Sequence, residues 1–509
     1  MQKLAIEYLR TTVARLPDKT ALVDDSGEIT FGALWHRALH AARDIADRVG
    51  RNGLPVAVEI EKSIDAIVAI VAIQLSGNLY VPFDPNSPPE RRERMLQTLG
   101  SPATIRVNIG ALELDGQIIG GRATGADTSN AEIEAALFDG LVARKNIDPL
   151  YVIFTSGTTG TPKGVTISNA AVIDYIDWVR HTYAVDESEI IANQAPLYFD
   201  NSVLDIYLCF ACGATLHLLA ASRFMFPDDV VSYLAANKIS LIFFVPSLLS
   251  NFAAVNALQE HDLGALRKVL FAGEPMPLST LRYLRERLPQ ALLSNLYGPT
   301  EITVDAIYWT FGTEIETLTE VPLGKACENK TIIFLDEHGA PVTEPDAVAE
   351  ICVAGVGVAL GYWNNPERTA EVFIQNPEHS RYAERIYRTG DLGYVSSRDG
   401  LIYMTGRKDG QFKHRGYRIE PGEIESALSA LGEVTQSCVI YDADHREIVA
   451  FYTPAEPGKE LRGAHKLLAG RLPAYMIPRR FVAVARMPVT PNGKVDRKAL
   501  WAGYKKPGG

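Results

Sequence analysis

Residues 151–165 read YVIFTSGTTGTPKGV, an apolar strand followed by a loop rich in glycine and hydroxyl side chains. Between residues 155 and 164 the loop carries five hydroxyl side chains, three glycines and Lys163. Backbone N–H groups of a glycine-rich turn can converge on one concavity, where hydroxyls and a lysine add further donors. Because Lys163 follows Pro162 and precedes Gly164, this is not a Walker A loop, which ends in Gly-Lys-Ser/Thr. The stretch predicts a polyphosphate site rather than an ordinary surface turn.

The length and composition of the whole chain indicate a soluble globular protein of several domains. A length of 509 residues predicts two to four domains, and 47% hydrophobic with 22% charged residues is ordinary for globular chains. The longest apolar run, 66–73, is far shorter than the roughly 20 residues that span a bilayer, so a buried helix and no membrane partner are expected. The N-terminus lacks the features of a signal peptide, which predicts a cytoplasmic location. A net charge of −11 argues against a nucleic-acid partner.

The cysteine pattern favours reduced core thiols. The five cysteines are odd in number, scattered and mostly in apolar surroundings. Cys209 and Cys212 form a C-x-x-C pair, but no second pair or histidine cluster accompanies it. A metal or redox role is therefore not favoured for these two residues.

Strands and helices alternate between residues 227 and 297. The predicted elements are a helix over 230–236, strands at 241–245, 268–271 and 292–296, and intervening helices that end near 255 and cover 278–288. After its first helix this order is β-α-β-α-β, which predicts a parallel sheet covered on both faces. Ligands bind at the carboxyl ends of such strands. Phe244, Ala272 and Leu296 stand at those ends, as does the loop after Phe154, so we expect these segments to surround one cleft.

The segment after Gly406 reads as a small α+β unit of roughly a hundred residues. Its predicted elements are a helix that starts near Glu420, a hairpin of 438–441 with 448–452, a helix over 461–472 and a strand at 481–484. The sequence thus predicts a large domain over 1–405, a link at 406–410 and a small domain over 411–509.

Six further motifs follow the loop along the chain. They are FDNS at 199–202, FAGEP at 271–275, NLYGPTE at 295–301, YRTGD at 387–391, GRKD at 406–409 and PNGK at 491–494. Together they resemble the adenylation enzymes of nonribosomal peptide synthesis, within the larger family of acyl-CoA synthetases and luciferases. The resemblance covers nearly the whole chain, including 80–85 and 472–478. It implies an α/β fold with a large N-terminal region of doubly wound sheets and a small, mobile α+β C-terminal domain.

The resemblance also implies an ATP-dependent reaction with Mg²⁺. A carboxylate would attack the α-phosphate of ATP, so cations must offset the charge that develops. Lys494 resembles the mobile lysine that bridges carboxylate and α-phosphate, and Lys163 would hold phosphate. Glu301 resembles the residue that holds Mg²⁺, Asp391 the carboxylate that accepts the ribose hydroxyls, and Tyr297 the ring stacked on adenine. The remaining residues predicted to bind ATP are Thr155, Ser156, Gly157, Thr158, Thr159, Gly273, Glu274, Pro275, Asn295, Gly298, Thr300 and Arg407.

By the same resemblance the small domain would rotate between two half-reactions. Asp409 corresponds to the hinge, which absorbs a large backbone change. In the second orientation the face over 413–418 would line a tunnel for a pantetheine thiol. The alternative for residues 408–418 is an ordinary solvated run of charges.

Asp200 is the most informative residue for the substrate. In the family, an Asp at this point of the motif pairs with the α-ammonium of an amino acid, whereas members acting on fatty or aryl acids lack it. The alternative is a helix N-cap, a role that Ser202 could also fill. A buried carboxylate needs a partner, so an α-amino acid is expected.

The predicted substrate pocket is apolar apart from its ends. Its residues are Asp200, Asn201, Leu204, Phe244, Leu270, Ala272, Leu296, Val304 and Asp305, with Lys494 at the carboxylate. The lining is similar to that of stand-alone L-proline:peptidyl carrier protein ligases, although Asn201 and Asp305 depart from them. From this lining, L-proline is the predicted substrate. Because an acid at position 305 resembles serine-activating sites, serine is an alternative, as are D-alanine or another small amino acid.

The expected acceptor is the phosphopantetheine thiol of a separate carrier protein. Fifteen residues follow Lys494, too few for a fused carrier domain, and no G-x-S-x-G elbow occurs. Arg479, Arg480 and Arg497 are candidates for docking an acidic carrier. One rival hypothesis is a carboxylic acid:CoA ligase. Another is an inactive nucleotide-binding assembly subunit, against which the intact Lys494, Glu301 and Asp391 speak.

Overall fold

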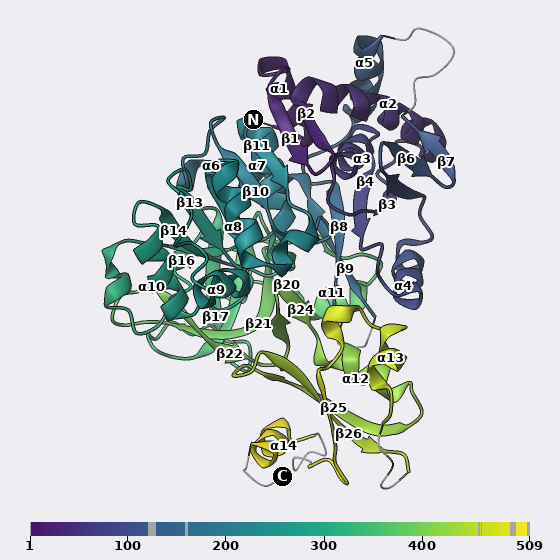
Figure 1. Cartoon of the computed structure of the whole chain (residues 1–509). Coiled ribbons are helices and arrows are strands. Elements are labelled where there is room, and N and C mark those ends of the chain that lie inside the picture. Colours follow the sequence, from purple (N-terminus) through teal and green to yellow (C-terminus); the bar gives the residue numbers. More distant parts are fainter. Residues whose placement is uncertain are drawn as a thin grey trace. The chain divides into compact units, whose positions relative to one another are not determined.

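The computed structural model describes residues 2–120, 129–157, 161–456, 459, 461–488 and 495–505 (Figure 1). It divides into two compact units, each described here by itself. The first comprises Met1–Pro85, Leu99–Ile153 and Gly164–Gly406. The second comprises Asn86–Thr98, Phe154–Lys163 and Arg407–Gly509, so the glycine-rich loop groups with the C-terminal segment.

A nine-stranded sheet forms the main frame of the first unit. Its order is β16 (Lys325–Ala326), β15 (Ile307–Phe311), β14 (Leu292–Tyr297), β13 (Lys268–Phe271), β12 (Leu241–Phe244), β10 (Ile190–Asn193), β11 (Thr215–Leu218), β1 (Thr20–Asp24) and β2 (Gly27–Thr30). The strands from β14 to β1 pair in parallel, whereas β15, β16 and β2 are antiparallel at the two edges. The predicted parallel sheet is therefore confirmed, with antiparallel edges that the sequence pattern did not indicate.

The β-α-β-α-β order predicted over 241–297 is confirmed almost to the residue. β12, β13 and β14 alternate with α9 (Pro246–Ala254) and α10 (Leu278–Arg287), and α8 (Pro227–Ala236) precedes them. Proline occupies the first turn of α8 and α9, where its missing N–H costs nothing. The apolar runs of all three strands are almost completely buried, as expected for a sheet covered on both faces.

Two further sheets complete the strands of this region. The eight-stranded sheet has the order β19 (Gly361–Tyr362), β9 (Lys163–Ser168), β8 (Pro149–Thr155), β4 (Leu79–Phe83), β3 (Pro55–Glu59), β5 (Thr104–Asn108), β6 (Ala111–Leu114) and β7 (Gln117–Ile119). The five-stranded sheet has the order β17 (Lys330–Leu335), β18 (Ala349–Gly355), β21 (Arg385–Val395) and β20 (Phe373–Gln375), with β22 (Ile402–Arg407) paired to β21.

Helices cover the two larger sheets. They include α1 (Ile6–Arg15), α2 (Phe31–Val49), α3 (Ile64–Leu75), α5 (Asn130–Leu141), α6 (Asn169–Thr182), α7 (Asn201–Cys212) and α11 (Pro366–Val372). The apolar run 66–73 lies within α3, whose side chains from Ala66 to Leu75 are all buried. Ser63 caps α3 by accepting a hydrogen bond from the Ala66 N–H. Within the described residues, no helix has both the length and the hydropathy required to cross a bilayer.

The second unit is built on a three-stranded sheet. β25 (Val434–Asp442) and β26 (Glu447–Pro454) form the predicted hairpin, drawn as two long arrows in Figure 1, and β27 (Arg480–Ala483) joins β26 in parallel. The other elements are α4 (Pro89–Leu99), β23 (Phe412–His414), β24 (Tyr417–Ile419), α12 (Pro421–Ser429), α13 (Ala464–Ala469) and α14 (Arg497–Tyr504). A buried ion pair between Arg91 and Glu423 connects α4 to α12.

The helix predicted over 461–472 is shorter than expected. Gly463, with a φ of 68°, precedes α13, and Gly470 ends it after six residues. Pro473 then excludes helical backbone at the residue before it. Local backbone chemistry thus limits a segment whose apolar pattern extends further.

All five cysteines are buried and free. Burial raises the pKa of Cys209, Cys212, Cys327 and Cys438 above the ordinary thiol value. The prediction of reduced core thiols is thereby confirmed, since a buried protonated thiol is a poor nucleophile and a poor metal ligand.

Candidate functional site

The glycine-rich loop that follows β8 has three buried polar side chains, Thr155, Ser156 and Lys163, whereas Thr161 is exposed. Thr155 is 9% exposed, and its hydroxyl finds no hydrogen-bond partner among the described residues. A Cβ on Gly157 would lie 1.9 Å from the carbonyl oxygen of Thr161, so only glycine fits this turn. Thr158 and Thr159 lie outside the described residues. An unpaired buried hydroxyl in a native protein is rare, and here it is consistent with a ligand at the loop.

The carboxyl ends of three parallel strands lie side by side in the first unit. Phe244 of β12 is paired with Phe271 of β13, which is paired with Asn295 of β14. Ala272 and Leu296 follow directly on β13 and β14, and both are buried. The predicted pocket residues Phe244, Leu270, Ala272 and Leu296 therefore come from neighbouring strands.

The motif after β13 closes this edge of the sheet. Gly273 has a φ of 97°, which favours glycine, and Pro275 is exposed. The Glu274 carboxylate accepts a hydrogen bond from the Ser247 N–H at 2.9 Å, in the first turn of α9. A carboxylate at a helix N-terminus satisfies an otherwise unpaired donor, so Glu274 stabilises the start of α9.

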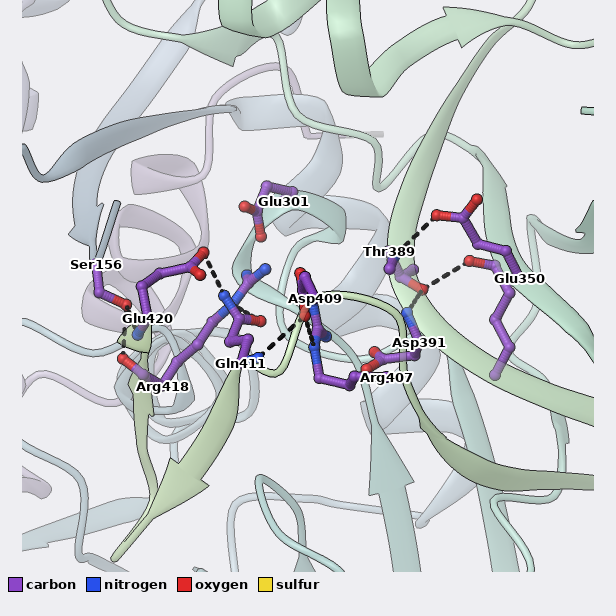
Figure 2. Close-up of polar contacts among 12 residues, drawn as sticks. Ser156, Glu301, Glu350, Thr389, Asp391, Arg407, Asp409, Gln411, Arg418 and Glu420 are labelled. Atoms are coloured by element: carbon purple, nitrogen blue, oxygen red, sulfur yellow. Dashed lines mark hydrogen bonds and ion pairs between the residues drawn. The ribbon is translucent and has the colours of Figure 1, made fainter. Parts of the chain in front are cut away.

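Tyr297 and Asp391 lie together, although 94 residues separate them. The Tyr297 hydroxyl donates to Oδ2 of Asp391 at 2.5 Å. The Thr389 hydroxyl accepts from the Asp391 N–H at 3.0 Å and donates to the Ile351 carbonyl at 2.6 Å (Figure 2). These bonds hold the Asp391 carboxylate beside Tyr297 and its backbone beside Thr389.

Asn295 has a partner on its own unit. Its side-chain amide donates to the Pro322 carbonyl at 2.8 Å, and the residue is 6% exposed. The amide nitrogen is thereby used to hold the segment beyond β14. Asn295 can contribute to a base-binding edge mainly through its amide oxygen.

The turn after β14 is tightly packed. A Cβ on Gly298 would lie 2.2 Å from the carbonyl oxygen of Val304, so the close approach of 298 to 304 requires glycine. Thr303 and Val304 have φ values of 61° and 66°, a region that β-branched residues rarely adopt. Such strain concentrates at functional sites, and Val304 is one of the predicted pocket residues.

Glu301 is completely buried in the short 3₁₀ turn Thr300–Ile302. Its Oε1 accepts a hydrogen bond from the Tyr362 hydroxyl at 2.8 Å. One fixed carboxylate suits Mg²⁺, which proteins often hold through one or two carboxylates together with substrate phosphates. Among the described residues no group of three or more His, Cys, Asp or Glu side chains is arranged to hold a metal without such a substrate.

Asp305 is anchored by two residues that the sequence pattern did not indicate. The Tyr175 hydroxyl of α6 donates to Oδ2 of Asp305 at 2.6 Å, and Lys330 Nζ donates to the Asp305 carbonyl at 2.5 Å. Burial and the neighbouring carboxylate raise the pKa of Tyr175 well above its ordinary value, so its hydroxyl keeps the proton. The protein itself thus supplies a donor to this carboxylate.

Asp200 stands at the N-terminus of α7 and is 9% exposed. Its side chain makes no capping hydrogen bond. Ser202 does not cap either, because its hydroxyl donates to the Phe199 carbonyl at 2.6 Å. Asn201 and Leu204 occupy the first turn of α7, and Leu204 is completely buried. The N-cap explanation of Asp200 is therefore wrong.

In the second unit, the predicted hinge residue Asp409 forms an ion pair with Arg407 at 2.8 Å. Although burial acts in the opposite direction, the Arg407 guanidinium holds the pKa of Asp409 below its usual value. Asp409 also accepts from the Gln411 N–H at 3.1 Å (Figure 2). Lys494 lies outside the described residues, so its reach stays a prediction.

The three candidate docking arginines have partners. Arg479 and Arg480 pair with Glu447 at 3.3 and 2.8 Å, and Arg497 pairs with Glu425 at 2.8 Å. Arg479 is 75% exposed, whereas Arg497 also donates to the Val439 carbonyl at 2.6 Å. Of these side chains, Arg479 is the most accessible to a partner.

The sequence pattern missed the residues that hold the predicted ones. These are Tyr175, Lys330, Tyr362, Thr389, Gln411 and Glu420. Thr389 belongs to the YRTGD motif, and Glu420 closes the charged run, so motif position gave a weak signal for these two. Tyr175 and Tyr362 lie 130 and 61 residues from their partners in sequence, and no local pattern indicates them.

Two family models match the chain. The AMP-binding enzyme model covers residues 9–363, and the model of the AMP-binding enzyme C-terminal domain covers 423–494. Zwittermicin A synthase ZmaJ of Bacillus cereus is 32% identical over 501 residues, with 96% of this chain and 93% of that protein covered. Phosphinothricin tripeptide synthetase PhsB of Streptomyces viridochromogenes is 35% identical, and the match covers 96% of this chain but 41% of that protein.

Solved structures share the fold. Holo-PA1221, an NRPS protein that contains adenylation and PCP domains, has a TM-score of 0.82 at 24% identity, with 98% of this chain and 84% of that chain covered. The α/β architecture with a large N-terminal and a smaller C-terminal domain is thereby confirmed. The chain belongs to the AMP-binding enzyme family and is an adenylating, AMP-forming ligase of the nonribosomal peptide synthetase type.

Proposed function

We propose that this enzyme activates an α-amino acid, L-proline, as its adenylate and transfers it to the phosphopantetheine thiol of a separate carrier protein. The observation that carries the proposal is the state of Asp200. Its carboxylate is buried at the first turn of α7 and does no capping work. The helix N-terminus stabilises the negative charge, and an α-ammonium group is the natural counter-charge for it.

The apolar strand ends support a small, uncharged substrate side chain. Phe244, Ala272 and Leu296 lie on adjacent strands and are buried. The Tyr175–Asp305 hydrogen bond supports proline over serine, because Asp305 already receives a donor from the protein. Serine, D-alanine or another small amino acid remain the alternatives should the substrate displace Tyr175.

The ATP site would be formed by the glycine-rich loop, the Gly273–Pro275 backbone, Asn295, Tyr297, Gly298, Thr300, Asp391 and Arg407. Lys163 and Lys494 would offset phosphate charge, and Glu301 would hold Mg²⁺, which supplies further charge neutralisation when bound. The pairing of Tyr297 with Asp391 supports a common role of these two in nucleotide binding. Asp409 is the proposed hinge between a large domain over 1–405 and a small domain over 411–509.

A carrier protein is supported by one structural relative that contains a carrier domain. PA1221 has adenylation and PCP domains, and much of PhsB extends beyond the part that this chain matches. Arg479, exposed on the second unit, is the proposed contact for an acidic carrier. The face over 413–418 would guide the pantetheine thiol.

Amino-acid-dependent exchange of labelled pyrophosphate into ATP tests the proposal. The panel contains the twenty amino acids, D-alanine and a series of aliphatic acids. We expect exchange with proline and its loss in Lys494→Ala. Exchange with aliphatic acids and none with amino acids would instead favour a carboxylic acid:CoA ligase, and a peak on serine would overturn the substrate alone.

A further inference from the structure

Two side chains of the glycine-rich loop are bound by the segment 418–420 within the second unit. Lys163 Nζ lies 3.5 Å from Oε1 of Glu420, and the side chains of this ion pair are only 8% and 4% exposed. The Ser156 hydroxyl donates to the Arg418 carbonyl at 2.8 Å and accepts from the Glu420 N–H at 3.2 Å (Figure 2). The segment therefore contacts the loop through its backbone and through a carboxylate.

A carboxylate and a phosphate make the same kind of contact with a lysine. Both are anions with oxygen acceptors, and each needs the ammonium as counter-charge in a buried place. If both lay against Lys163, two like charges would share one cation where water cannot screen them. Binding of a polyphosphate at Lys163 and the Glu420 contact are therefore antagonistic.

Gln411 connects this contact to the segment that carries Asp409. Its side-chain nitrogen donates to Oε1 of Glu420 at 2.5 Å, and its side-chain oxygen accepts from Arg418 Nε at 2.8 Å. Its backbone N–H donates to Asp409 at 3.1 Å. Gln411 is 6% exposed, so water cannot readily replace these hydrogen bonds. Loss of any one of them would leave a buried polar group unsatisfied and destabilise the contact.

We propose that Glu420 is an internal anion that competes with the triphosphate of ATP and with pyrophosphate for Lys163 and Ser156, and that Gln411 positions it. This inference rests on the proposed phosphate-binding role of the loop. When a polyphosphate binds Lys163, the Glu420 carboxylate loses its counter-charge, and the segment from 409 to 420 is released from the loop. When the polyphosphate leaves, Glu420 replaces it. Binding of polyphosphate and formation of the Glu420–Lys163 contact thus weaken each other by the same free energy.

The first test compares wild type with Glu420→Gln, which keeps the shape and removes the charge. Glu433→Gln is the matched control, because Glu433 is exposed on the same unit and only its backbone carbonyl makes a described hydrogen bond. Calorimetric titration measures the affinity for ATP and for inorganic pyrophosphate without an amino acid. We expect Glu420→Gln to bind both roughly tenfold more tightly, a change of about 1.4 kcal/mol, and the control to match wild type.

Unchanged or weaker binding by a folded Glu420→Gln protein would overturn the inference, with folding checked by circular dichroism. The more conservative Glu420→Asp keeps the charge on a shorter side chain, and its affinity for ATP and pyrophosphate should lie between those of wild type and Glu420→Gln. If wild type and every variant fail to bind ATP, the proposed function fails as well. If ATP binds equally to all of them and exchange activity persists, only the inference fails.

A second test addresses the positioning role of Gln411. Gln411→Leu should tighten pyrophosphate binding in the wild-type background by a few-fold. It should have no further effect in Glu420→Gln, because both substitutions act through one contact. A purely structural role of Gln411 predicts instead the same change in both backgrounds, and that additivity would refute the positioning role.

Discussion

The hydrogen bond between Tyr175 and Asp305 offers a sharp prediction about stability. Tyr175→Phe keeps the buried ring and removes the donor to a carboxylate that is 1% exposed. A hydrogen bond to a charged group contributes about 1.5–3 kcal/mol, so we expect a loss of about 2 kcal/mol in the free energy of unfolding. Trp178, whose ring centroid lies 5.9 Å from that of Tyr175, gives a nearby fluorescence signal for urea titration.

A double-mutant cycle with Asp305→Asn isolates the contact from other effects of each substitution. We expect a coupling energy above about 1 kcal/mol, because the two residues share one bond. Tyr183→Phe is the matched control, since its buried hydroxyl bonds the neutral Ser294 hydroxyl at 2.9 Å and should contribute only about 0.5–1.5 kcal/mol. Additivity of Tyr175→Phe and Asp305→Asn within about 0.5 kcal/mol would refute this reading of the contact.

The same substitution bears on substrate choice. If Asp305 ends the pocket as proposed, Tyr175→Phe leaves its carboxylate short of a donor, and a substrate hydroxyl can replace the missing one. We therefore expect the ratio of serine to proline in pyrophosphate exchange to rise by roughly tenfold. An unchanged ratio would place Asp305 outside the substrate site.

Three further predictions concern other contacts. Tyr297→Phe removes the donor to Asp391 and should raise the KM for ATP about tenfold, with kcat less affected; an unchanged KM in steady-state kinetics would separate the pair from nucleotide binding. Tyr362→Phe removes the hydroxyl that donates to Oε1 of Glu301 and should shift the Mg²⁺ concentration for half-maximal exchange, whereas an identical Mg²⁺ titration would argue against Glu301 as the ligand. Burial lowers the pKa of the His217 imidazole to about 4 in the folded protein, whereas a histidine of the unfolded chain has a pKa of about 6.5. As the pH drops from 7, the unfolded chain therefore binds the proton first, and the free energy of unfolding falls. Between pH 7 and pH 5 the free energy of unfolding of wild type should fall by about 2 kcal/mol more than that of His217→Phe. Parallel curves of unfolding free energy against pH for the two proteins would contradict this prediction.

The sequence predicted the central strands well because their signals are local. β12, β13 and β14 are strands of four to six residues rich in apolar side chains, and Pro246 and Gly273 mark where β12 and β13 end. Parallel pairing then followed from the alternating order of elements. Extent was harder to predict where glycine interrupts an apolar pattern, as Gly463 and Gly470 do around α13.

The contacts of the site were not predictable from local pattern. Tyr175, Tyr362 and Lys330 reach their partners only after distant strands and helices pack, and a lone tyrosine in a helix normally signals a core position. Glu420 lies two residues after a charged run, 408–418, that could equally be solvated surface. Its burial against Lys163 depends on the loop and the C-terminal segment sharing one compact unit, which no motif expresses.

The most direct measurement of the proposed amino-acid specificity compares L-proline with cyclopentanecarboxylic acid, which keeps the ring and carboxylate and lacks the amine. Pyrophosphate exchange is measured with wild type and with Asp200→Asn. We predict that wild type prefers proline by at least roughly a hundredfold, and that Asp200→Asn loses most of this preference, since an unpaired buried charge costs about 3–5 kcal/mol. Equal exchange with both acids, or an undiminished preference in Asp200→Asn, would contradict the assignment of Asp200 to the α-ammonium group.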